Sequence, residues 1–146
     1  LGKSYSKLGD YEKAKSALNK SIQIKETAES YLEIGNIWAA VKDYPKSIVA
    51  FKKSIDLNPD YVSAHFNLGN SYFDQKEYKL AFDCYLNAVK LNPRHSGSLN
   101  CLGILFTKKG KYEKALELFE KAVLYDPQNL TFQKNVKTCK EKLGLS

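Results

Sequence analysis

The residues with the most reactive side chains are few and widely separated. The chain has two histidines, His65 and His95, and three cysteines, Cys84, Cys101 and Cys139. No combination of them shows the close spacing of a zinc site, and no glycine-rich phosphate loop is present. The carboxylates alternate with lysines, a pattern typical of solvated helical faces. We therefore predict no catalytic residue, no bound metal and no cofactor, and we expect that the chain is not an enzyme.

Two asparagines indicate binding rather than reaction. Asn67 and Asn70 lie one helical turn apart in the stretch AHFNLGNSYF, residues 64–73. Asparagine is unfavourable inside helices because its amide competes for backbone hydrogen bonds. The same amide offers both donors and an acceptor, which suits the backbone of an extended peptide whatever its side chains are. These two residues are candidates for ligand contacts; the alternative is that they are solvated or bonded to a neighbour.

The composition is that of a folded protein with a diffuse positive charge. The chain has 146 residues, of which 43% are hydrophobic and 27% charged, and a net charge of +7 that is almost all lysine, since Arg94 is the single arginine. Arginine binds phosphates and guanines through two parallel hydrogen bonds from its guanidinium group, and lysine cannot. Nucleic acid is therefore not an expected partner. An odd number of cysteines without a CxxC pair indicates free thiols and a cytoplasmic, intracellular location.

No apolar run approaches the roughly 18 residues that a membrane-spanning helix needs, so no membrane span is expected. The sequence begins at Leu1 inside a repeated pattern. We therefore expect it to be part of a longer chain.

The sequence repeats itself at intervals of 34 residues. The phrases YLEIGNIW, HFNLGNSY and LNCLGILF begin at residues 31, 65 and 99. A second set of phrases begins at residues 43, 77 and 111. These phrases are DYPKSIVAFKKSIDLNP, EYKLAFDCYLNAVKLNP and KYEKALELFEKAVLYDP. An incomplete earlier copy is visible in LGKSY at residue 1 and DYEKAKSALNKSIQIK at residue 10. Self-similarity at a fixed period indicates a repeat architecture.

Both halves of each unit have helical periodicity. His65, Leu68, Gly69 and Tyr72 fall at positions i, i+3, i+4 and i+7, which is one face of a helix. Prolines at 59, 93 and 127 end the second helix of their units, because proline cannot continue a helix. Each unit is therefore a predicted pair of helices joined by a short turn. Small residues recur where the two helices must touch, and aromatic residues recur where the space between them must be filled.

These residues resemble the tetratricopeptide repeat (TPR), whose pattern is Trp-x2-Leu-Gly-x2-Tyr, then Ala-x3-Phe, then Pro. The best copy here reads His65, Leu68, Gly69, Tyr72, Ala81, Tyr85 and Pro93. The resemblance covers nearly the whole chain and implies an all-α fold, a right-handed α-solenoid of stacked antiparallel helix pairs. We expect one domain, 1–146, with a truncated repeat at 1–27, full repeats at 28–61, 62–95 and 96–129, and a capping helix at 130–146.

The resemblance also predicts a binding surface. In TPR proteins the face of the first helices opposite the packing stripe lines a concave groove that holds partners. The predicted partner-binding residues on this face are Leu32, Glu33, Asn36, Phe66, Asn67, Asn70, Phe73, Cys101 and Ile104. Phe66 and Ile104 have an alternative role in packing between repeats, and Cys101 is expected to be a small filler residue rather than a reactive thiol.

The predicted function is that of a non-catalytic protein–protein interaction scaffold that binds a peptide or partner segment in the groove. The alternative is a substrate-recognition arm of a larger enzyme, such as a glycosyltransferase. Some TPR proteins grip the C-terminal carboxylate of chaperones with Lys, Asn, Asn, Lys and Arg. The matching positions here are Leu32, Asn36, Asn67, Gly97 and Cys101. Because all three cations are missing, we do not expect carboxylate-clamp binding of a chaperone tail.

Overall fold

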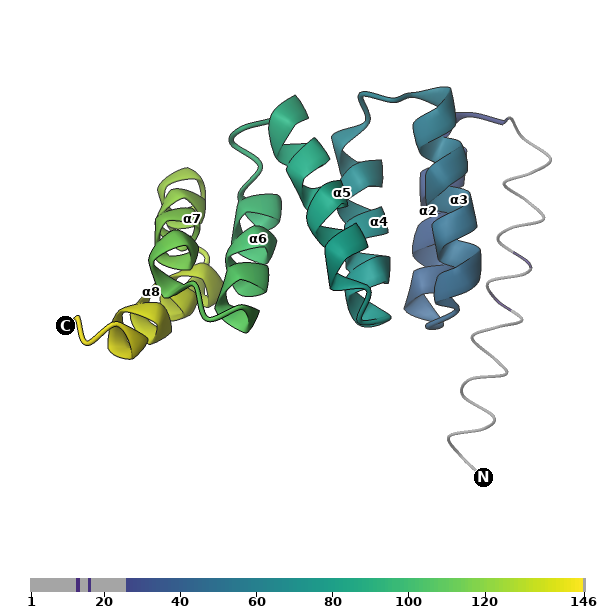
Figure 1. Cartoon of the computed structure of the whole chain (residues 1–146). Coiled ribbons are helices and arrows are strands. Elements are labelled where there is room, and N and C mark those ends of the chain that lie inside the picture. The colour runs from purple at the N-terminus through teal and green to yellow at the C-terminus, as the bar shows by residue number, and fades with distance from the viewer. Residues whose placement is uncertain (1–12, 14–15, 17–25, 146) are drawn as a thin grey trace. The chain divides into compact units, whose positions relative to one another are not determined.

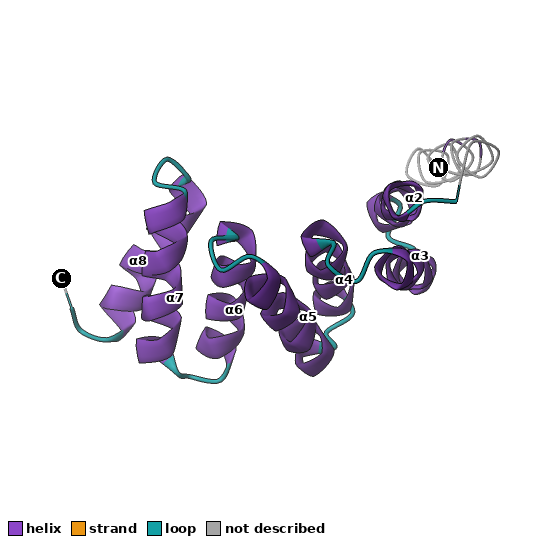
Figure 2. Ribbon diagram, turned by 90° about the horizontal axis from the view of Figure 1, so that it is seen from above, coloured by secondary structure: helices purple, strands orange, loops and turns teal. Residues whose placement is uncertain are grey.

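The computed structural model describes Lys13, Ser16 and residues 26–145. Within these residues every regular element is an α-helix (Figures 1 and 2). The chain divides into two compact units, residues 1–77 and 78–146. The first unit contains α2 (Ala28–Ala40), α3 (Tyr44–Leu57) and α4 (Val62–Asp74). The second contains α5 (Tyr78–Leu91), α6 (Ser96–Lys108), α7 (Tyr112–Tyr125) and α8 (Leu130–Lys142). In each unit, successive helices pack on one another as antiparallel neighbours, which confirms the predicted all-α fold.

One turn recurs at the predicted 34-residue interval. Lys42 and Lys76 have φ of 64°, while Gly110 and Gly144 have φ of 73° and 72°. At each of these positions the backbone adopts the left-handed conformation that follows many helix C-termini. In the first copy the Lys42 N–H donates to the Ala39 carbonyl at 3.0 Å, and the next N–H reaches back to the Trp38 carbonyl at 2.9 Å. This pair of bonds satisfies the last carbonyls of the helix and reverses the chain within two residues.

In the first unit, a glycine lets α2 approach α3 closely. A Cβ on Gly35 would lie 2.5 Å from Cδ1 of Phe51, whose side chain is 0% exposed. Two buried serines complete the contacts of α3. The Ser54 hydroxyl donates to the Ala28 carbonyl at 2.7 Å, and the Ser47 hydroxyl pairs with that of Ser71 on α4 at 2.9 Å. Serine therefore fills the small position of the repeat without leaving its hydroxyl unsatisfied.

In the second unit, the same contact joins α6 to α7. A Cβ on Gly103 would lie 2.6 Å from Cε1 of Phe119, which is 2% exposed and packs with Ala115 and Cys139. The last helix, α8, contributes Phe132 to a second buried cluster with Leu99 and Ala122. Lysines occupy much of its outer surface, so α8 has one apolar face and one polar face.

Candidate functional site: the faces of the first helices

The predicted partner-binding residues fall in both units. Those of the first unit lie on α2 and α4, which are in contact with each other: Leu32, Glu33, Asn36, Phe66, Asn67, Asn70 and Phe73. Cys101 and Ile104 lie on α6 in the second unit. Each unit therefore carries its own part of the predicted surface.

In the first unit, two of the predicted asparagines hydrogen-bond to each other. The Asn67 Nδ2 group donates to Oδ1 of Asn36 at 2.9 Å, and Asn36 is exposed on α2. The bond uses one of the two amide hydrogens of Asn67 and one lone pair of Asn36. Two N–H hydrogens of Asn36, the second N–H hydrogen of Asn67 and the Asn67 carbonyl oxygen take no part in this bond. The pair therefore offers donors and an acceptor at one point of the surface.

Apolar side chains lie on the same two helices. Leu32, Phe66 and Phe73 are half-buried, so each keeps part of its surface accessible, while Glu33 is exposed. Half-buried apolar groups next to amides are the ordinary lining of a peptide-binding surface. Their partial burial also fits the alternative packing role that the sequence allows for Phe66.

In the second unit, a cavity of about 390 Å³ opens over the predicted face. It is lined by Ile104, Thr107 and Lys108 of α6, by Tyr112 and Phe119 of α7, and by Asn135, Thr138, Cys139 and Lys142 of α8. Ile104 also packs against the buried cluster that includes Phe119, and its role in binding stays a prediction.

A second amide pair lies at the edge of this cavity. The Asn135 Nδ2 group donates at 2.8 Å to Oδ1 of Asn100, which is only 6% exposed. Asn100 and Asn135 are not among the predicted binding residues. The 34-residue spacing from Asn67 through Cys101 to Asn135 is the sequence signal that points to Asn135.

Cys101 is a poor nucleophile in this setting. Burial raises the pKa of its thiol to about 11, and a hydrogen bond with Tyr85 offsets only part of that effect. At neutral pH the residue is therefore a neutral thiol, and the thiolate is the reactive form. This agrees with the expectation of a small filler residue.

The two histidines have structural partners. His95 is the N-cap of α6, where its Nδ1 accepts from the Ser98 N–H at 3.2 Å, and burial lowers the pKa of its side chain. The His65 Nε2 group donates to the Pro59 carbonyl at 2.8 Å. Among the described residues, no group of three His, Cys, Asp or Glu side chains could hold a metal ion. None of the described helices has the length and apolar character to cross a membrane.

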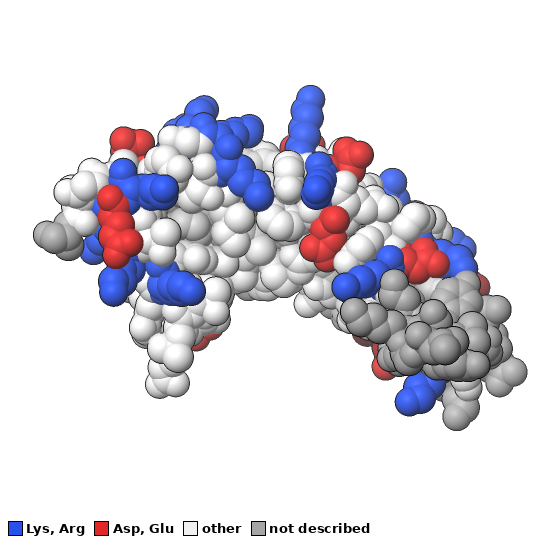
Figure 3. Space-filling view, turned by 90° about the horizontal axis from the view of Figure 1, so that it is seen from below, with Lys and Arg blue, Asp and Glu red and all other residues white. Residues whose placement is uncertain are grey.

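The surface charge is mixed. On the face shown in Figure 3, lysine and acidic side chains are interspersed with uncharged surface. Few of the charged groups pair closely: in the part of the chain that the structure describes, Lys46 lies 3.7 Å from Asp43 and Lys121 lies 3.6 Å from Glu117.

Family models for the tetratricopeptide repeat match most of the chain. One model matches residues 62–95 and 97–129, a second, described as a TPR repeat, matches 35–76, and a third matches 1–27. Together with the repeated helix pairs and their glycine–aromatic contacts, these matches show that the chain belongs to the tetratricopeptide repeat family. TPR proteins are in general non-catalytic modules for protein interaction.

Solved structures share the fold at low sequence identity. A crystal structure of MamA has a TM-score of 0.80 at 22% identity, covering 98% of this chain and 84% of that one. The first TPR of Spaghetti (RPAP3), bound to the HSP90 peptide SRMEEVD, has a TM-score of 0.77 at 22% identity, with coverage of 82% and 94%. In a further crystal structure of MamA protein (TM-score 0.73, 24% identity, 81% of this chain), the match spans 64% of the other chain. No curated protein sequence matches the chain.

Proposed function

We propose that this chain is a non-catalytic scaffold that holds an extended segment of a partner protein on its first-helix faces. The observation that carries the proposal is the cavity of about 390 Å³ in the second unit. Apolar Ile104 lies in it beside the amide of Asn135 and the hydroxyl of Thr138. An extended peptide needs both kinds of contact, because its backbone must be hydrogen-bonded and its side chains need apolar pockets.

The first unit supports the same mode of binding. Its exposed Asn36–Asn67 pair presents donors and an acceptor within hydrogen-bond reach of one another, which is the arrangement that a peptide group requires. Half-buried Leu32, Phe66 and Phe73 would take up the apolar side chains. Glu33, Asn70 and Cys101 complete the proposed set.

The first TPR of Spaghetti (RPAP3) is bound to an HSP90 peptide, but we do not expect this chain to hold a chaperone tail through a carboxylate clamp. In the sequence, the positions that match the clamp are Leu32, Asn36, Asn67, Gly97 and Cys101, so the two asparagines are kept and the three cations are missing. Without an ammonium or guanidinium group, a desolvated carboxylate has no charge partner. A peptide backbone, which is neutral, is the better ligand. The role of a recognition arm in a larger enzyme stays an alternative prediction.

Site-specific photo-crosslinking tests this proposal. A benzophenone side chain placed at Leu32 or at Ile104 should capture the partner. The same group at Val49 or Leu124, which are exposed on second helices, should not. Equal capture from all four positions would contradict the assignment of the groove.

An alanine series tests the amides directly. The variant with Asn36→Ala, Asn67→Ala and Asn70→Ala should bind the captured partner at least about tenfold more weakly, because each lost hydrogen bond costs roughly 0.5–1.5 kcal/mol. A variant with Lys52→Ala and Lys53→Ala, on the exposed surface of α3, is the matched control. Undiminished binding by the asparagine variant would refute the role of the amides.

A further inference from the structure

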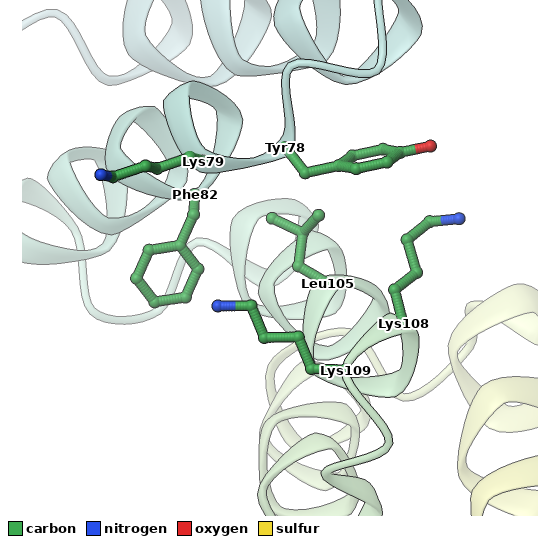
Figure 4. Close-up of a pocket in the computed structure, with 6 residues that line it drawn as sticks. All are labelled: Tyr78, Lys79, Phe82, Leu105, Lys108 and Lys109. Atoms are coloured by element: carbon green, nitrogen blue, oxygen red, sulfur yellow. The ribbon is translucent and has the colours of Figure 1, made fainter.

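A second cavity lies on the other side of α6, between α5 and α6. It has a volume of about 610 Å³ and, like the first, is formed entirely within the second unit. Figure 4 shows the residues that line it, which are Tyr78, Lys79, Phe82, Leu105, Lys108 and Lys109. We call it the α5–α6 pocket. Only Lys108 also lines the groove cavity described above.

The floor of the α5–α6 pocket is apolar and firmly held. Leu105 is 4% exposed and therefore belongs to the core of the unit. Phe82 is half-buried and meets Phe106 edge to face, with ring centroids 5.7 Å apart and an interplanar angle of 87°. Edge-to-face ring pairs of this kind are stabilising, so the floor is preformed rather than dependent on a ligand.

The rim of the α5–α6 pocket is basic. The Lys108 ammonium lies 5.0 Å from the centre of the Tyr78 ring, and the Lys109 ammonium lies 5.7 Å from the centre of Phe82. Lys79 and Lys109 are exposed, and neither forms an ion pair with a described carboxylate. In Figure 4 the three ammonium groups stand apart rather than converging on one point: Lys108 extends beside Tyr78, Lys109 beside Phe82, and Lys79 away from Leu105.

The distance between the three ammonium groups favours some anionic ligands over others. A single phosphate group is best held by cations that converge on it, whereas spread cations suit several anions along a chain. Nucleic acid would bring such anions together with bases that stack on rings. No arginine lines the pocket, and arginine is the residue that binds phosphates and guanines with a bidentate fork. A protein segment whose carboxylates flank an apolar side chain satisfies both the rim and the floor.

We propose that the α5–α6 pocket is a docking site for an acidic protein segment, in which a large apolar side chain enters over Phe82 and Leu105. Glutamate or aspartate residues on either side of it pair with Lys79, Lys108 and Lys109. The site goes beyond the proposed groove: it uses side-chain charge and one apolar anchor, while the groove uses amides toward a peptide backbone. The exposed lysines also give it a strong dependence on salt, since such pairs are screened.

Fluorescence anisotropy with a defined probe tests the proposal. The probe is a short labelled peptide with a Leu-Phe pair between runs of glutamate, titrated with the 146-residue chain. Replacing Leu-Phe by Ser-Gly, or every glutamate by glutamine, should each weaken binding. Charge reversal by Lys79→Glu with Lys109→Glu should weaken it about tenfold, since two exposed ion pairs become repulsive. Both lysines are exposed, so their replacement should leave the fold intact.

A control with the same net charge separates a docking site from general attraction. Lys134→Glu with Lys137→Glu reverses two exposed lysines on α8, and it should change the affinity of the probe less than about twofold. Equal loss in both double variants would overturn the proposal. So would undiminished binding of the Ser-Gly peptide, or tighter binding of a single-stranded RNA of equal charge. The Asn36→Ala, Asn67→Ala variant should bind the probe normally, so the groove and the pocket are tested independently.

Discussion

The contact between Gly103 and Phe119 gives the sharpest test of how the repeats are held together. A Cβ at Gly103 would lie 2.6 Å from Cε1 and 2.8 Å from Cδ1 of Phe119. Carbon atoms in contact prefer about 3.5–4.0 Å, so the ring would have to move by roughly 1 Å. Phe119 is 2% exposed and packs against Ala115 and Cys139, so it cannot move freely.

Two opposite effects set the magnitude for Gly103→Ala. Overpacking a buried site costs roughly 1–3 kcal/mol. Replacing glycine by alanine inside a helix gains about 1 kcal/mol. The free energy of unfolding should therefore fall by up to about 2 kcal/mol, although the same change would stabilise an unhindered helix. Denaturation in urea followed by circular dichroism measures this, and hydrogen exchange of the α6 and α7 amides localises it.

A double-mutant cycle separates the two effects. Phe119→Leu removes Cε1 and leaves two methyl groups that can rotate away from the new Cβ. In that background, Gly103→Ala should become neutral or stabilising, with a coupling energy of about 1–3 kcal/mol. Position 87, on the exposed face of α5, serves as a control. The difference in unfolding free energy between Asn87→Ala and Asn87→Gly measures the difference in helix propensity in the same chain. Equal destabilisation by Gly103→Ala in both backgrounds would show that the Phe119 ring is not the obstacle to a Cβ at position 103.

Three further predictions concern single residues. Asn135→Ala should lower the free energy of unfolding by about 1–3 kcal/mol, because it leaves the buried carbonyl of Asn100 without its donor. Stability should fall between pH 9.0 and about 11, where the unfolded chain loses the Cys101 proton and the folded chain keeps it. Lys42→Gly should raise the unfolding free energy by up to about 1 kcal/mol, because glycine adopts a positive φ without strain, as Gly110 does at the equivalent turn.

Each of these has a clear contrary result in urea denaturation. An Asn135→Ala variant as stable as the parent would mean that Asn100 finds another donor at no cost. A Cys101→Ala variant should lose less stability than the parent between neutral and alkaline pH, and identical losses would exclude Cys101 as the cause. A Lys42→Gly variant that is less stable than the parent would show that the left-handed turn carries no strain.

For the described residues, the sequence was sufficient for the secondary structure and for the contacts inside two helix pairs, α2 with α3 and α6 with α7. These contacts depend on local features: helical periodicity, prolines at the ends of second helices, and the phase between glycine and the aromatic residue 16 positions later. Gly35 with Phe51 and Gly103 with Phe119 meet as the repeated phrase predicts. A short turn leaves two amphipathic helices few ways to bury their apolar faces, so the pairing follows from the pattern.

The relation between the asparagines could not be predicted in this way. The repeat suggests a ladder of equivalent positions 34 residues apart, such as Asn36 and Asn70. In the structure Asn36 bonds to Asn67, 31 positions along, and Asn100 bonds to Asn135, 35 positions along. Within each unit the two helices meet through different flanks, α2 with α4 and α6 with α8, so the residues in contact are not equivalent copies.

By itself the sequence determined the period, the helices, the turns and the family to which the chain belongs. Only the tertiary structure decided which amides pair, that Cys101 is buried enough to stay protonated, and that Lys108 and Lys109 lie over the rings of α5. The reason is the range of the interactions. Helical periodicity and capping depend on residues that are close together in the sequence. A pocket forms where side chains from separate helices converge, so it depends on how those helices pack.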